Sequence, residues 1–403
     1  MENNYIILFM CALIMLSYIF NLISKYSKIP SVILLLATGI GLKQLSLQYN
    51  FSLDGINNYV QILGTVGLIM IVLEAALDLH LTRDKVPLIR NSFLSSIAIL
   101  ALSVVGIALL LQQLLMQPFI NSLVYAIPLS IMSSSIVIPS VTYLEEAKKE
   151  FLVYEASFSD IIGILVFNFF TAQHALDGMA VLSFAGSILL GIVISVVFSF
   201  LLIYLLSKIK INVKFFLIFS ILIALYVSGK MLHLPSLIII MMFGLLINNW
   251  HLLKNQKLLP LAIFQNEEVG NINTQLNSIT AESAFLIRTF FFVAFGFSIN
   301  LRDMLQTDVV IAGSLIVGIL LVSRLVLLGL FLKSSIFPEV LMVPRGLITI
   351  LLFYLIPDNM KIGAFNEGIL SFVVIVTSLL MMIGLLLYRE KIEDKGGTFV
   401  EES

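Results

Sequence analysis

The sequence predicts an all-α polytopic membrane protein with about 13 transmembrane helices. Of its 403 residues, 60% are hydrophobic and 12% are charged, whereas soluble domains carry about 25% charged residues. Thirteen stretches are apolar and close to the roughly 20 residues that a membrane-spanning helix needs. Two of these stretches are interrupted by proline, which predicts an internal repeat. The net charge of −1 gives no indication of a nucleic-acid partner.

The expected spans form one transmembrane domain over residues 1–388, followed by a short cytoplasmic tail over 389–403. The longest connection, 250–278, is expected to join two halves, and an amphipathic segment in the membrane interface is the alternative. The spans are 5–24, 29–46, 57–79, 93–115, 120–144, 151–173, 179–207, 213–230, 234–249, 279–299, 308–332, 338–357 and 367–388.

The distribution of Lys and Arg predicts the orientation. With the N-terminus outside, 16 of the 23 Lys and Arg residues fall on the cytoplasmic side, four fall outside and three fall within spans. Cytoplasmic loops are enriched in Lys and Arg. The bias therefore favours an odd number of spans, with the N-terminus outside and the C-terminus in the cytoplasm.

Two expected helices carry interruptions at corresponding places. Pro128 and Pro139 flank Ser133–Ser135 in the fifth span, and Pro344–Gly346 lies within the twelfth. Proline removes an amide donor and breaks the helix. The interruptions are seven spans apart, and this odd offset predicts an inverted repeat of spans 1–6 against 8–13, with 179–207 as the link and the two broken helices crossing. Ordinary kinks in two packed helices are the alternative.

Helix rise predicts the depth of the charged residues within the spans. Asp160 lies roughly 3 Å from the membrane midplane, and Glu155 and Arg324 lie roughly 10 and 6 Å toward the cytoplasm. We expect Glu155 and Arg324 to pair and to join the two repeats. Asp160 is then left without a fixed counter-ion, and a membrane-embedded carboxylate of this kind indicates an ion or proton pathway.

Further candidate ligands carry oxygen atoms, which hard alkali cations prefer. Ser134 and Ser135 lie near the midplane of the fifth span, and Glu74 lies roughly 9 Å toward the cytoplasm. Arg345 is expected to provide a fixed positive charge against the carbonyls of a broken helix. The partner of Arg288 is left open. The four histidines show no metal-binding spacing, and no HExxH or Gly-x-Ser-x-Gly motif supports an intramembrane enzyme.

Several segments resemble signatures of the monovalent cation–proton antiporter superfamily. YEASFSDIIGI (154–164) resembles the span-6 signature, in which Glu-Ser-x-Phe-Asn-Asp precedes a small apolar run. LEAALDLHL, FFFVAFGFSINL and VPRGLITILLFYLIP resemble other signatures, so the resemblance covers about spans 3 to 13. It implies that Glu155 is structural, that Asp160 binds the ion and that Ser135 replaces a threonine. Ser159, Ala156 and Ile136 depart from the family's usual Asn or Asp, Ser and Asp.

The resemblance implies a Na+/H+ antiporter of the bacterial inner membrane, a homodimer without cofactors beyond the transported ions. It implies a mobile core, about 93–173 and 308–388, and a scaffold with the dimer contacts, about 5–79 and 213–299. The expected set of cation- and proton-binding residues is Asp160, Ser159, Ser135, Ser134 and Glu74, with Na+ at Asp160. Because Ser159 has no accessible ionisation, we expect electroneutral 1:1 exchange. A passive channel, a sensory protein, a cation-coupled symporter, and K+ or Li+ as substrate are the alternatives.

Overall fold

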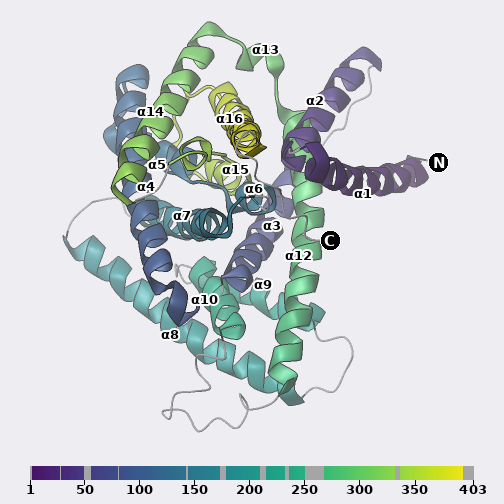
Figure 1. Ribbon diagram of the computed structural model, residues 1–403, viewed down its shortest axis with the longest axis vertical. Coiled ribbons are helices and arrows are strands. Elements are labelled where there is room, and N and C mark those ends of the chain that lie inside the picture. The colour runs from purple at the N-terminus through teal and green to yellow at the C-terminus, as the bar shows by residue number, and fades with distance from the viewer. Residues whose placement is uncertain are drawn as a thin grey trace. The chain divides into compact units, whose positions relative to one another are not determined.

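A computed structural model describes most of the chain, and its described residues are helical without any strand (Figure 1). The first part of the 250–278 connector, the last ten residues of the tail and all four histidines lie outside the described residues. The described ranges are 2–27, 29–49, 56–79, 81–141, 144–172, 178–208, 215–231, 236–249, 267–331 and 336–393.

Helices occupy every expected span. The longer helices are α1 (Glu2–Ser27), α2 (Ser31–Tyr49), α3 (Ile56–Asp78), α4 (Val86–Leu115), α5 (Phe119–Ser130), α6 (Ser134–Ser140), α7 (Glu146–Ala172), α8 (Gly178–Lys208), α9 (Phe215–Met231), α10 (Ser236–Asn248), α12 (Glu267–Ser298), α14 (Thr307–Phe331), α15 (Leu347–Tyr354) and α16 (Gly368–Glu393). Short helical turns are η1 (Arg83–Lys85), α13 (Leu301–Met304), η3 (Glu339–Leu341) and η4 (Asp358–Met360).

Within the described residues, six helical segments are long and apolar enough to cross a membrane, and four shorter helices are also apolar. The multi-pass prediction is confirmed, whereas the number of 13 spans stays a prediction. Several helices extend beyond the expected spans: α4 begins at Val86 and α12 at Glu267, which is inside the expected connector. The sequence 267–298 contains no proline, so nothing interrupts a helix that begins before the apolar residues of the span.

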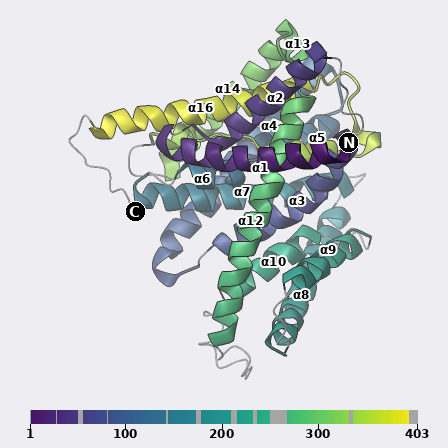
Figure 2. The same ribbon diagram turned by 90° about the vertical axis from the view of Figure 1, so that its right-hand side faces the viewer.

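Contacts divide the chain into two compact units. The first comprises Met1–Val60, Leu88–Gly163 and Thr289–Ser403, and the second comprises Gln61–Pro87 and Ile164–Arg288. In the first unit α14 packs along α16, and α5 contacts α15 (Figure 1). In the second unit α10 packs against α8 and α9 (Figure 2).

The first unit contains both interruptions that the prolines predict. The chain is not helical at residues 131–133, between α5 and α6, nor at residues 342–346, between η3 and α15. A Cβ atom on Gly346 would lie 2.8 Å from Ser133 Cβ. The two breaks therefore touch, and the crossing of two broken helices is confirmed.

Two glycines of the first unit, Gly39 and Gly296, let the backbones of α2 and α12 come into direct contact. A Cβ atom on Gly39 would lie 2.7 Å from the backbone nitrogen of Phe297 and 2.9 Å from the carbonyl carbon of Gly296. Backbone atoms cannot move aside as a flexible side chain can. Small residues serve the same purpose where membrane helices pack closely.

We expect Gly39→Val to separate α2 from α12 and to lower the free energy of unfolding by about 1–3 kcal/mol, as overpacking does elsewhere. Gly41→Val is the matched control, because Gly41 lies on the same helix with nothing within 4 Å of its added Cβ. Thermal unfolding of both variants in detergent measures the effect. Equal midpoints for the two variants would contradict this account of the contact.

Candidate functional site

The first break leaves four consecutive backbone amides that need partners away from water. The amide of Ile131 donates to the Pro128 carbonyl at 3.4 Å, and the amide of Ser133 donates to the Pro344 carbonyl at 3.0 Å. The other two amides, of Met132 and Ser134, donate to side chains of α7. The break is therefore stabilised partly by its own helix, partly by the second break and partly by α7.

Asp160 and Ser159 are the two α7 residues that accept these amides. The Met132 amide donates to Ser159 Oγ at 2.9 Å. The Ser134 amide donates to Asp160 Oδ2 at 3.1 Å, and the Ser134 hydroxyl donates to the same oxygen. The adjacent α7 residues Ser159 and Asp160 thus bind Met132 and Ser134 of the broken segment.

The Asp160 carboxylate is buried, with 3% of the residue exposed. Its second oxygen, Oδ1, is also buried and has no hydrogen-bond partner among the described residues. One oxygen is therefore fixed by Ser134, whereas none of the described residues fixes the other.

Arg345 satisfies carbonyls at the second break. Its Nε donates to the Leu129 carbonyl at 2.7 Å, and its Nη1 donates to the Val343 carbonyl at 2.9 Å. Leu129 lies in the last turn of α5, where carbonyls have no helical partner. The guanidinium thus lies against buried carbonyls that have no partner within a helix, where a positive charge is favourable.

Glu155 and Arg324 form the ion pair that their depths suggest. Arg324 Nη1 and Nη2 donate to the two carboxylate oxygens of Glu155, each at 2.8 Å. Arg324 Nε donates to the Glu339 carbonyl at 2.6 Å, and Ser95 Oγ donates to Glu155 at 3.3 Å. Both charges are buried, and their hydrogen bonds offset part of the desolvation cost.

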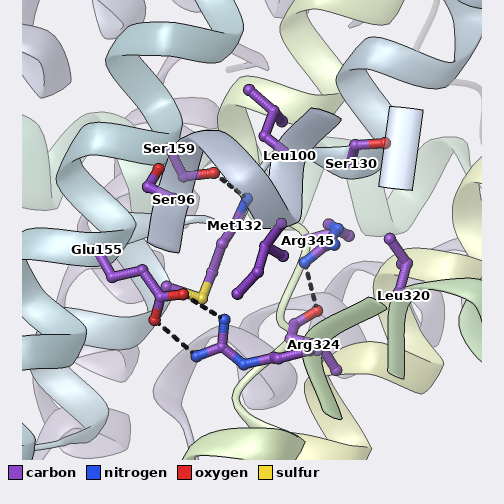
Figure 3. Close-up of a pocket in the computed structure, with 11 residues that line it drawn as sticks. Ser96, Leu100, Ser130, Met132, Glu155, Ser159, Leu320, Arg324 and Arg345 are labelled. Atoms are coloured by element: carbon purple, nitrogen blue, oxygen red, sulfur yellow. Dashed lines mark hydrogen bonds and ion pairs between the residues drawn. The ribbon is translucent and has the colours of Figure 1, made fainter. Parts of the chain in front are cut away.

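A small cavity of about 10 Å³ lies beside this ion pair (Figure 3). That volume is near the lower limit for one water molecule. Ser96 of α4 lines it, and sequence reasoning missed this residue, although serines at 92, 95, 96 and 103 follow helical spacing. The remaining lining residues are Ile99, Leu100, Ser130, Met132, Glu155, Ser159, Leu320, Arg324, Val343 and Arg345.

The other residues of the expected binding set have different partners. Ser135 shares a hydrogen bond of 2.9 Å with Ser133 rather than with Asp160. Glu74 lies in the second unit, where Arg288 Nη1 and Nη2 donate to its two oxygens at 2.8 and 3.1 Å. This contact identifies the partner of Arg288, which sequence reasoning left open.

Removing either charge of the Glu155–Arg324 pair should destabilise the protein. We expect Glu155→Gln or Arg324→Gln to lower the free energy of unfolding by about 3–5 kcal/mol, because each leaves a buried charge without its partner. The double variant should lose less than the sum of the two. The measurement is thermal unfolding, with Glu146→Gln as the control, since Glu146 is exposed on the same helix. Additive losses would show that the pair contributes no coupling.

Comparison with known proteins agrees with this geometry. Two structures of the sodium proton antiporter MjNhaP1 from Methanocaldococcus jannaschii share the fold. One, at pH 8, has a TM-score of 0.68 and 17% sequence identity, and the alignment covers 97% of this chain and 100% of that chain. The other, from electron microscopy, has a TM-score of 0.66 and 17% identity, with 98% and 97% covered.

Curated protein sequences gave no match. The transmembrane sodium/hydrogen exchanger family matches residues 11–388, nearly the whole chain. This family comprises transporters rather than enzymes, and the resemblance in the sequence is confirmed. The chain belongs to the sodium/hydrogen exchanger family.

Proposed function

We propose that this protein exchanges a monovalent cation, Na+, for H+ at Asp160. One observation carries the proposal: Asp160 is a buried carboxylate beside a broken helix, with Ser134 on one oxygen and no partner for the other among the described residues. The other two buried carboxylates that the structure describes, of Glu155 and Glu339, are instead paired with Arg324 and Lys148. The half-buried carboxylate of Glu74 is paired with Arg288. Asp160 is therefore the carboxylate best suited to exchange its ligand.

Competition at one carboxylate accounts for coupling. A proton on Asp160 removes the negative charge that attracts a cation, and a bound cation disfavours protonation. If the protein crosses between its two states only when Asp160 is loaded, each cation moved one way requires a proton moved the other way.

The proposed ligand set consists of Asp160, Ser134, Ser135, Ser159 and Glu74. Ser134 has the strongest support, because its hydroxyl already contacts Asp160. Ser159 and Ser135 participate in the hydrogen bonds that fix the break. Glu74 has the weakest support, because its two oxygens accept from Arg288.

We also propose the cellular arrangement. The protein would lie in the bacterial inner membrane, and the bias of Lys and Arg supports an orientation with the N-terminus outside and the C-terminus in the cytoplasm. The core is 93–173 and 308–388, and the scaffold, which carries the homodimer contacts, is 5–79 and 213–299, with 179–207 as the link. Both broken helices fall in the first compact unit, which supports a core built around them.

Asp160→Asn should insert and fold but not exchange. The amide oxygen of asparagine can still accept from Ser134, and loss of a buried charge lowers the insertion cost. In proteoliposomes with an imposed pH gradient, Na+ addition should collapse the gradient for the wild type but not for the variant. Asp308→Asn is the control, because Asp308 is exposed at the start of α14. Exchange at the wild-type rate in Asp160→Asn would refute the assignment.

The same vesicles distinguish the alternatives. A channel or a symporter would not drive protons out in response to inward Na+, and a sensory protein would move neither ion. Parallel additions of Na+, K+ and Li+ identify the substrate cation.

Exchange should be electroneutral. Ser159 cannot ionise near neutrality, and Glu155 and Glu74 are each paired with an arginine. We therefore expect the exchange rate to be unchanged when valinomycin and a K+ gradient impose a membrane potential. A rate that changes with voltage, and loses this dependence in Glu74→Gln, would make Glu74 a second proton carrier.

A further inference from the structure

A second ion pair of the first unit joins α7 to the entry of the second broken helix. Lys148 Nζ lies 2.5 Å from Glu339 Oε1, with 11% of the lysine side chain and 1% of the glutamate side chain exposed. The same ammonium group donates to the Phe337 carbonyl at 3.1 Å and lies 5.9 Å from the centre of the Tyr388 ring. Neither Lys148 nor Glu339 touches Asp160, and neither has a role in the exchange described above.

Glu339 opens η3 (Glu339–Leu341), and this turn is fixed from three helices. Lys148 of α7 binds its carboxylate, and Arg324 of α14 donates to its backbone carbonyl at 2.6 Å. A Cβ atom on Gly384 of α16 would lie 2.8 Å from Leu341 Cβ, so η3 also packs closely against α16. The Lys148–Glu339 pair is the contact that attaches this turn to the helix carrying Asp160.

The chain from η3 to the cation site is short. Pro344 follows Glu339 by five residues, and its carbonyl accepts the Ser133 amide at 3.0 Å. Arg345 comes next and donates to the Leu129 carbonyl at 2.7 Å. Ser133 is followed directly by Ser134, which binds Asp160. A displacement of η3 would therefore reach the ligands of Asp160 through a few covalent and hydrogen bonds.

The placement of residues on α7 supports the same connection. Lys148, Glu155 and Ser159 are spaced by seven and four residues, which places them on one face of the helix. Along this face α7 contacts the entry to the second break through Lys148 and the first break through Ser159. Lys148 and Asp160 are twelve residues apart, about 18 Å along the helix.

We propose that Lys148 and Glu339 form a positioning pair, which fixes the position of the second broken segment relative to Asp160. The pair thereby determines cation affinity and turnover. The proposal rests on the proposed exchange at Asp160. The pair acts through Pro344 and Ser134 rather than on the ion, so it should alter the apparent KM for Na+ as well as the maximal rate.

The test compares Na+-dependent proton exchange in proteoliposomes for Lys148→Gln, Glu339→Gln, the double variant Lys148→Gln/Glu339→Gln and the charge exchange Lys148→Glu/Glu339→Lys. Rates are normalised to folded protein, and thermal midpoints are measured in parallel. Lys149→Gln is the matched control, since it removes the same charge from the neighbouring position, which lies on a different face of α7. The double variant leaves no buried charge unpaired, so it tests the proposal even where a single variant does not fold.

For the single and double variants we expect the maximal rate to fall about tenfold and the apparent KM for Na+ to change about threefold, within the range of couplings between contacting residues. Lys149→Gln should match the wild type, and the charge exchange should recover part of the lost rate. Wild-type KM and rate in the double variant would overturn the proposal, as would lower thermal midpoints with unchanged kinetics. Absence of exchange in the wild type would instead refute the proposed function.

Discussion

The interruption of helices in an apolar interior is the constraint from which the arrangement of the site follows. Unpaired amides away from water cost several kcal/mol each, so every amide at the first break needs an acceptor. The four acceptors are the Pro128 and Pro344 carbonyls, Ser159 and Asp160. Three of them lie outside the broken helix. The break, α7 and the second break must therefore move as one body if their hydrogen bonds are to survive.

Asp160 would serve the fold and the proposed exchange with different oxygens. Oδ2 satisfies the Ser134 amide and hydroxyl, while Oδ1 has no partner among the described residues. A change of ligand at Oδ1 need not disturb the backbone, because the structural hydrogen bonds are on Oδ2. This separation would allow a residue that holds a broken helix also to exchange its ligand, as the proposed function requires.

Sequence reasoning predicted the parts of the site that depend on helix rise and on proline. The depths of Glu155 and Arg324 suggested their contact, and Pro128 and Pro344 indicated the two breaks. Which serine meets Asp160 could not be predicted, because the non-helical residues 131–133 leave no fixed angular spacing between α5 and α6. Ser134 contacts Asp160, whereas Ser135 contacts Ser133.

Pairs between helices distant in sequence were missed for a different reason. Arg288 could be paired with Glu74 only once α3 and α12 were known to pack together, as the close approach of Gly67 to Ile287 shows. Glu339 was overlooked because it lies at the edge of an apolar segment, where sequence indicates a solvated loop. Its burial depends on α14 and α16, which cover η3.

The buried charges around the site can be counted for the proposed exchange of one cation for one proton. Asp160 and Glu155 carry two negative charges, and Arg324 and Arg345 carry two positive charges, all buried in the first unit. The buried Glu339 adds a third negative charge, which its partner Lys148 balances. The sum is zero when Asp160 is ionised and empty. A proton and a monovalent cation each change it to +1, so the two loaded forms carry the same net charge. A membrane potential then acts equally on both forms as they cross, and its effects on the two halves of the cycle cancel. Arg345, which lies against carbonyls rather than a carboxylate, supplies the positive charge that offsets an ionised Asp160.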